Sequence, residues 1–369
     1  MNNINYQVGN HTFFNKFQAA DYAYSTGQTV KFNLYESSFD LANWLTEPSQ
    51  TWDQLLDRRA RQIEAKGLPI ILHFSGGTDS YTIYKVFERN NIHIDILYFR
   101  TRSAAKHRAM YEPVVEFLNK GIYDPHCKII IKNDFEGLDI LSNTYYSENW
   151  IWDTSRRYTF AIQGGNQIEH DELCKTLGKD AISIIGLEKP RLHFDNQRVY
   201  SFQDDINFAK LMGSSDLDCF YLTPELPELH VKQSYMLKNY LKTKFGLAKN
   251  NSTVDLKQVN FQFNPARTDW NEYSAASGRF GDIASSQLQH ARAQGSQLII
   301  PESENYLDAV WHGLGDELFK SIKGTDTFKN YVTGMINVRK GNAGKYFHLT
   351  GNDLHSIPMI RSKYYELNF

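Results

Sequence analysis

The fold is decided by one stretch of sequence, Pro69-Ile70-Ile71-Leu72-His73-Phe74-Ser75-Gly76-Gly77-Thr78-Asp79-Ser80. Its first six residues are a mostly apolar run, which is typical of a buried parallel strand. In the residues that follow, Ile83, Tyr84 and Phe87 fall on one face of a helix. The stretch therefore predicts a strand, a glycine-rich turn and a helix, in that order.

The turn has the composition of an anion-binding loop. Its two glycines let the backbone approach an anion closely, and the N–H groups at the start of the next helix point toward such a site. Its hydroxyl groups add hydrogen-bond donors, and its carboxylate fits phosphates if Mg²⁺ lies between them. The candidate phosphate-binding residues are Ser75, Gly76, Gly77, Thr78, Asp79 and Ser80. The alternative is a serine-rich turn that only caps the helix.

The hexapeptide Ser75–Ser80, at the end of the first strand of an α/β unit, resembles the pyrophosphate loop of the PP-loop ATP pyrophosphatase superfamily. Asparagine synthetase, NAD synthetase, tRNA-modifying enzymes and phosphoadenylyl-sulfate reductase belong to this superfamily, whose fold is called adenine nucleotide α-hydrolase-like (HUP). The resemblance extends over residues 67–250, and the flanking regions resemble those of phage-encoded members. The chain contains no match to the Walker-type Gly-x-x-x-x-Gly-Lys pattern.

The resemblance implies that the protein is an enzyme that uses ATP and Mg²⁺. A substrate carboxylate or carbonyl oxygen attacks the α-phosphorus of ATP, pyrophosphate leaves, and ammonia or an amine then attacks the adenylate. Asp79 is the expected Mg²⁺ ligand and catalytic residue. In such a reaction the protein contributes mainly positioning and electrostatic stabilisation. We therefore expect an AMP-forming ligase.

The rest of the chain alternates strands with helices. Expected strands cover residues 69–74, 92–99, 128–131 and 181–185, and expected helices cover 79–90, 104–119 and 168–177. Such alternation implies right-handed crossovers and a parallel sheet. With the resemblance, it predicts an α/β, Rossmann-like fold with a parallel five-stranded sheet in the order 3-2-1-4-5 and helices on both faces. We divide the chain into an N-terminal α/β preface (1–66), a PP-loop domain (67–250) and a C-terminal cap (251–369).

Ligands of such a sheet bind beyond the carboxyl ends of its strands. The segment Gly186–Arg191 directly follows the expected strand 181–185. Its glycine allows a sharp exit beside the phosphate loop, so we predict that Gly186 contributes to nucleotide binding and that Lys189 and Arg191 are catalytic cations. The alternative is a solvated basic loop.

A second set of candidates lies at the end of the second strand. In the superfamily this strand end is near adenosine, so the resemblance makes Phe99 and Arg100 candidates for the nucleotide site. Strand aromatics are otherwise core residues. The basic residues in Arg100–Arg108 have three interpretations. They bind the nucleotide, they form a solvated helix face, or they bind nucleic acid.

Composition limits the partners and the compartment. A net charge of −2 gives no overall attraction to nucleic acid or to anionic lipid, so any such affinity would be local. No run approaches 18 apolar residues and the N-terminus lacks signal-peptide features, so we expect a cytoplasmic protein without membrane segments. Cys127, Cys174 and Cys219 lie far apart, which disfavours a disulfide framework or a zinc site.

The acceptor is expected to be a small molecule or a nucleobase. Residues 1–66 are too few for a glutaminase, and Asn2 follows Met1 where a glutaminase would have cysteine. A nitrogen nucleophile would therefore come from free ammonia, an amine substrate or a separate glutaminase acting as ammonia donor. The segment Trp150–Tyr158 either contacts the acceptor or anchors its own insertion. Two alternatives to the ligase stay open: a phosphoadenylyl-sulfate reductase-like or sulfur-transfer enzyme, although Cys219 lies far from the C-terminus, and a non-catalytic module that senses an adenine nucleotide.

Overall fold

The computed structural model describes a central sheet flanked by two smaller sheets and by helices. The described residues are 4–74, 78–101, 118–119, 121, 124–133, 165–186, 190–195, 198–203, 205, 216–245, 326–349 and 360–368. Most of the expected helix 104–119 and all of the segment Trp150–Tyr158 lie outside these residues.

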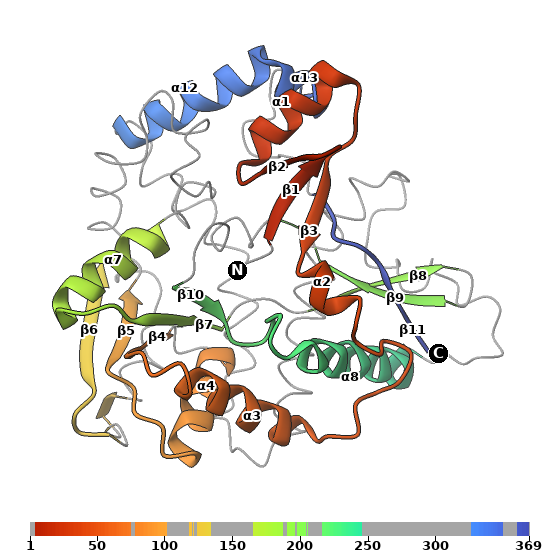
Figure 1. Ribbon diagram of the computed structural model, residues 1–369. Coiled ribbons are helices and arrows are strands. Elements are labelled where there is room, and N and C mark those ends of the chain that lie inside the picture. The colour runs from red at the N-terminus through yellow and green to blue at the C-terminus, as the bar shows by residue number, and fades with distance from the viewer. Residues whose placement is uncertain are drawn as a thin grey trace.

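The central sheet has five strands, all parallel (Figure 1). They are β4 (Ile70–Phe74), β5 (Ile96–Thr101), β6 (Lys128–Asn133), β7 (Ile182–Ile185) and β10 (Leu217–Cys219). Their spatial order is β10-β7-β4-β5-β6. Numbered along the chain, this order is the predicted 3-2-1-4-5, so the predicted fold class is confirmed. The topological switch point, at which the order reverses, lies between β4 and β7.

Helices cover both faces of this sheet (Figure 1). One face bears α3 (Trp52–Glu64), α4 (Thr78–Arg89) and α8 (Pro227–Phe245), and the other bears α7 (Gly165–Leu177). The alternation of β4 explains this division, because successive strand residues point to opposite faces. Leu72 packs in the core with α3 and α4, whereas Ile71 packs with Leu173 of α7.

The described N-terminal residues form a small α/β unit. It contains β1 (Ile4–Val8), β2 (His11–Phe13), α1 (Lys16–Thr26), β3 (Lys31–Leu34) and α2 (Glu36–Phe39), and its antiparallel sheet has the order β2-β1-β3. The Asn15 side chain caps α1 by accepting hydrogen bonds from the N–H groups of Phe17 and Gln18. A capping box formed by Thr51 and Gln54 begins α3.

A third sheet joins distant parts of the chain. Its antiparallel order is β11-β9-β8, with β8 at Arg191–Asp195, β9 at Arg198–Phe202 and β11 at Tyr365–Leu367. The remaining helices are α12 (Asp326–Lys340) and α13 (Asn342–Tyr346), and α13 packs against α1. One core cluster contains residues from β1, β7, β10 and β11, so segments from all three predicted regions of the chain pack together.

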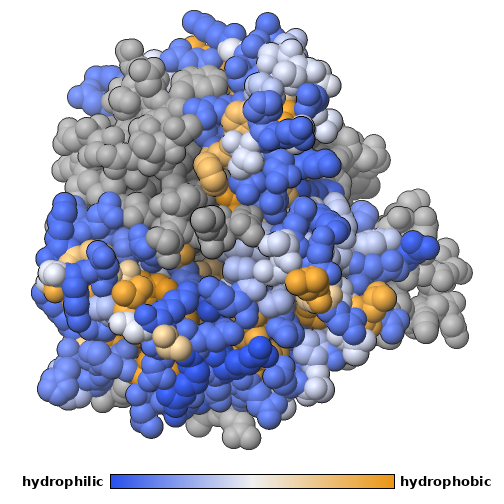
Figure 2. Space-filling view, viewed as in Figure 1, coloured by the Kyte–Doolittle hydropathy of each residue, from blue (hydrophilic) through white to orange (hydrophobic). Residues whose placement is uncertain are grey.

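The face of the molecule in Figure 2 is mostly hydrophilic, with apolar residues confined to small patches. Among the residues that the structure describes, no helix has the length and apolar character needed to cross a membrane. All three cysteines are free.

Candidate functional site

The first turn of α4 and the end of β7 meet at the carboxyl edge of the central sheet. Gly186 directly follows β7, and a Cβ atom built on it would lie 3.0 Å from Cδ1 of Ile83 and 3.4 Å from the backbone N of Ser80. The same Cβ would lie 3.5 Å from the carbonyl carbon of Asp79. Only a residue without a side chain therefore fits this approach without displacing a neighbour. The structure thus brings together the predicted residues Asp79, Ser80 and Gly186.

The described part of the phosphate loop lies at the helix start. Thr78 is the first residue of α4, Asp79 follows in the first turn and is partly buried, and Ser80 is buried. An acidic side chain in the first turn interacts favourably with the helix dipole. Ser75, Gly76, Gly77 and the side chain of Thr78 lie outside the described residues.

The predicted cations are described only in part. Arg191 is the first residue of β8, where it lies opposite Phe202 of β9 and is partly buried. Arg100 belongs to β5, but its side chain is not among the described ones, and neither is any part of Lys189. The structure therefore places Arg191 at the start of β8. That Lys189 and Arg100 approach a bound phosphate stays a prediction.

Phe99 lies in the core under α4. Its side chain has no exposed surface, and its ring centroid is 5.2 Å from that of Phe74 in an edge-on arrangement. The neighbouring Tyr98 is also buried and points toward the opposite face, where its ring lies 5.1 Å from that of His73. Phe99 and Tyr98 are therefore core residues of the sheet, which was the alternative to a role in the nucleotide site.

Sequence reasoning missed one residue that contacts the site. The hydroxyl of Tyr221 donates a hydrogen bond of 2.8 Å to the backbone carbonyl oxygen of Asp79. Tyr221 lies two residues after β10, the fifth strand, to which the sequence analysis assigned no residues. A strand of three residues is too short to show a recognisable hydrophobic periodicity in the sequence. No local pattern therefore marks Tyr221 as a functional residue.

A buried polar chain lies under α7, on the other face of the sheet. Ser183 Oγ is 3.2 Å from Nε2 of His73 and 2.9 Å from Nδ1 of His170, and Nε2 of His170 is 3.4 Å from Sγ of Cys174. We call these four residues the buried polar chain. Its members satisfy one another's hydrogen-bonding groups, as buried polar side chains must.

Two of the three cysteines, Cys127 and Cys174, are poor nucleophiles. Burial raises the pKa of the Cys127 thiol to about 12 and also raises the pKa of the Cys174 thiol. Both side chains are therefore thiols at neutral pH, whereas the thiolate is the reactive form. This disfavours sulfur chemistry at either residue.

Asp79 is the described residue best placed to hold a metal beside a nucleotide. Among the described residues, no three His, Cys, Asp or Glu side chains form a metal-binding group. Mg²⁺ commonly binds one or two carboxylates and takes its other ligands from substrate phosphates and water. Asp79 in the first turn of a helix fits that pattern.

No protein-family model matches the chain, and no curated protein matches it. The loop sequence and the geometry of the sheet edge are the features of the chain that point to a function.

Proposed function

We propose that this protein is a PP-loop ATP pyrophosphatase. It adenylates a carboxylate or carbonyl oxygen of its substrate, converting ATP to AMP and pyrophosphate, and the activated substrate then reacts with ammonia or an amine. The observation that carries the proposal is the position of the Ser-Gly-Gly-Thr-Asp-Ser stretch. It joins the central strand β4 to α4, at the switch point where open α/β sheets bind ligands, and Gly186 lies against that helix start.

Each residue type has a defined task in this reaction. The backbone N–H groups of the loop and of the first turn of α4 hold the pyrophosphate part of ATP. Asp79 would hold Mg²⁺, which would supply positive charge to the leaving pyrophosphate when bound. Lys189 and Arg191 are proposed to stabilise the same developing charge from the other side of the switch point.

The bond changes balance without a covalent enzyme intermediate. The substrate oxygen forms a bond to the α-phosphorus as the bond to the β-phosphate oxygen breaks. In the second step nitrogen attacks the activated carbon, AMP leaves with the former substrate oxygen, and the nitrogen loses a proton. The acceptor is proposed to be a small molecule or a nucleobase, the ammonia donor a separate protein or free ammonia, and the compartment the cytoplasm.

The test is separation of the products formed from ATP and Mg²⁺ by the full chain. The reaction is run alone and with pooled carboxylates, amines, tRNA and DNA. AMP and pyrophosphate formed only with one pool support the proposal and identify the acceptor class. ADP as the product overturns it, and nucleotide binding without turnover in any pool favours the sensing alternative.

The variant Asp79→Asn is expected to reduce Mg²⁺-dependent AMP formation by about 10²-fold or more, the usual effect of losing one electrostatic contact to the transition state. Lys189→Ala is expected to cost about 10²-fold for the same reason. Asp326→Asn is the matched control, since Asp326 is also an acid in the first turn of a helix, α12, and is exposed. Equal activity of Asp79→Asn and the control would overturn the role of Asp79.

A further inference from the structure

The segment that follows β10 reaches the first turn of α4 through Tyr221. The Tyr221 side chain is fully buried, its hydroxyl donates to the Asp79 carbonyl at 2.8 Å, and its ring stacks on that of Trp52 with centroids 6.1 Å apart. Nε2 of Gln233 donates a 2.7 Å hydrogen bond to the Tyr221 carbonyl oxygen. The ring, the hydroxyl and the backbone of Tyr221 are thus each held by a different element.

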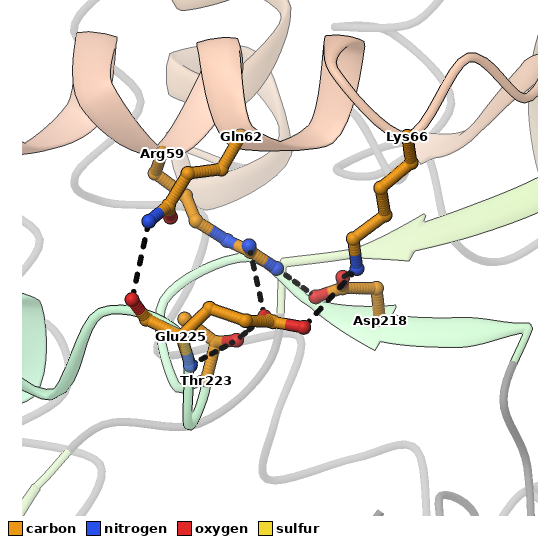
Figure 3. A network of polar contacts seen from close by, with 6 residues as sticks. All are labelled: Arg59, Gln62, Lys66, Asp218, Thr223 and Glu225. Carbon is orange, nitrogen blue, oxygen red and sulfur yellow. Dashed lines mark hydrogen bonds and ion pairs between the residues drawn. The ribbon is translucent and has the colours of Figure 1, made fainter. Parts of the chain in front are cut away.

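A charged network holds the strand end from which Tyr221 projects (Figure 3). The guanidinium of Arg59, in α3, pairs with the carboxylate of Asp218 in β10 and lies 3.2 Å from a carboxylate oxygen of Glu225. Nζ of Lys66 lies 2.9 Å from Asp218 and 3.4 Å from Glu225. Tyr221 falls between Asp218 and Glu225 in the chain, so both ends of its segment are fixed to the same helix.

Further hydrogen bonds complete the turn at Glu225. Its carboxylate accepts a hydrogen bond from the hydroxyl of Thr223, and its backbone N–H donates to the Thr223 oxygen at 3.4 Å. Nε2 of Gln62 donates a 3.1 Å hydrogen bond to the carbonyl oxygen of Glu225. Figure 3 shows Arg59, Gln62 and Lys66 all pointing from the α3 side toward this turn.

Arg59 and Asp218, the buried pair of the network, stay charged at neutral pH. Burial by itself lowers the pKa of Arg59 and raises that of Asp218, but the opposite charges outweigh burial in both cases. The pKa of Arg59 is raised and that of Asp218 is lowered. An ion pair that is embedded in directional hydrogen bonds has a narrow range of favourable geometries, so the network fixes the direction in which the segment 218–225 presents its side chains.

We propose that Tyr221 is a positioning residue for the nucleotide site, acting through the backbone of Asp79. This inference rests on the proposed function. The Asp79 carbonyl lies within the first helical turn, and the hydroxyl of Tyr221 adds a donor from outside the helix. That bond limits rotation of the Asp79 peptide and so holds the backbone from which the Asp79 side chain would bind Mg²⁺. Small misplacements of such a group cost large factors in rate.

The variant Tyr221→Phe removes the hydroxyl and keeps the ring that packs on Trp52. The matched control is Tyr235→Phe, because the hydroxyl of Tyr235 donates a buried 3.0 Å hydrogen bond to the carbonyl oxygen of Trp44, in a different core cluster. Each variant loses a hydroxyl-to-carbonyl hydrogen bond, and Tyr235→Phe also loses the 3.2 Å bond that its hydroxyl accepts from the N–H of Asn368. The control is therefore expected to lower the thermal midpoint at least as much as Tyr221→Phe. Only Tyr221→Phe is expected to affect the nucleotide site.

The readouts are MgATP binding by calorimetry and the Mg²⁺ concentration that gives half-maximal binding at fixed ATP, measured on the full chain. Tyr221→Phe is expected to weaken MgATP binding by about fivefold to tenfold, the effect of one lost hydrogen bond, and to raise the half-saturating Mg²⁺ concentration. A purely structural role would change the thermal midpoint and leave the Mg²⁺ dependence unmoved.

The outcomes separate the inference from the proposed function. A wild-type chain that does not bind MgATP overturns both. Wild-type binding that Tyr221→Phe reproduces, with the same Mg²⁺ dependence, overturns the inference alone. Equal losses in Tyr221→Phe and Tyr235→Phe also overturn it, because the effect would then follow stability and not the contact with Asp79.

Discussion

Replacing Asp218 by asparagine is expected to destabilise the protein by about 3 kcal/mol at neutral pH. The carboxylate of Asp218 pairs with Arg59 and lies 2.9 Å from Nζ of Lys66. Arg59 has no exposed surface, so the neutral amide leaves its guanidinium buried with Glu225 as its remaining charged partner among the described residues. The cost is mainly that of an undercompensated buried charge.

The magnitude follows from the burial of the two partners. Removing one member of a buried ion pair typically costs about 3–5 kcal/mol. The lower end applies here because the Glu225 side chain, at 46% exposure, still lies 3.2 Å from Arg59. Lys66, at 30% exposure, can turn its charge toward water once Asp218 is neutral.

The effect has a defined pH dependence. Burial tends to raise the pKa of Asp218, but Arg59 and Lys66 lower it below its usual value. A carboxyl group whose pKa is lower in the folded state contributes stability above the unfolded-state pKa, which is about 4. That contribution is lost as the pH falls through the folded-state pKa. The stability difference between wild type and Asp218→Asn is therefore expected to be complete at pH 7 and to shrink below about pH 4.

The assay is urea unfolding followed by tryptophan fluorescence between pH 7 and pH 3. The control variant is Glu64→Gln, which removes an exposed 2.7 Å ion pair with Arg61 near the end of α3, the helix that contains Arg59. This variant should cost at most about 0.5 kcal/mol. A loss below about 1 kcal/mol for Asp218→Asn at pH 7 would refute the reasoning, since that is the cost of an ordinary hydrogen bond. A difference that grows on acidification would refute the assigned charge state.

Two further substitutions test contacts of the central sheet, one at the candidate site and one on the face that α7 covers. Gly186→Ala is expected to weaken MgATP binding about tenfold in calorimetry. The new Cβ atom would lie 3.0 Å from Cδ1 of Ile83 and 3.4 Å from the backbone N of Ser80. Unchanged affinity would contradict this close approach. Ser183→Ala removes the hydroxyl that bonds both histidines of the buried polar chain and is expected to cost about 1–3 kcal/mol in urea unfolding. A variant as stable as wild type would show that the chain contributes no net stability.

The central sheet was predictable because its signals are local. The apolar run at 69–74 predicted a strand, and β4 covers Ile70–Phe74. The helical pattern after Ser80 predicted a helix at 79–90, and α4 covers Thr78–Arg89. The second strand was predicted to begin at Ile92, but β5 begins at Ile96. Ile92 and Ile94 are buried beside the sheet, so their alternation imitates a strand. Asn91, in the turn before this segment, has a positive φ, and pairing with β4 begins only at Ile96.

The smaller sheets depend on contacts that no local pattern encodes. β10 has three residues and becomes a strand by pairing with β7, and β11 pairs with β9 from the far end of the chain. A strand of this length gains its identity from its partner, since propensity in sheets mostly measures packing against neighbours. The resemblance to the PP-loop superfamily implied a fifth strand and its place in the order but not its residues.

The candidate site divides in the same way. Asp79, Ser80 and Gly186 could be found because glycines and hydroxyls follow strand ends in the sequence. Tyr221 could not, because its hydrogen bond to Asp79 joins residues 142 positions apart and a buried tyrosine is ordinarily a core residue. Local sequence thus supplies the groups that would touch a nucleotide, and long-range packing supplies their orientation.

The Arg59 network illustrates why that second contribution needs polar residues. Well-packed apolar side chains at Arg59 and Asp218 would give equal or greater stability, because desolvating two charges offsets much of their attraction. An apolar contact between α3 and β10 would also tolerate sliding and rotation, since dispersion and hydrophobic burial are not directional. The ion pairs and hydrogen bonds of the network are directional. They therefore fix where Tyr221 meets the first turn of α4, and the Tyr221→Phe experiment tests what that contact contributes to the site.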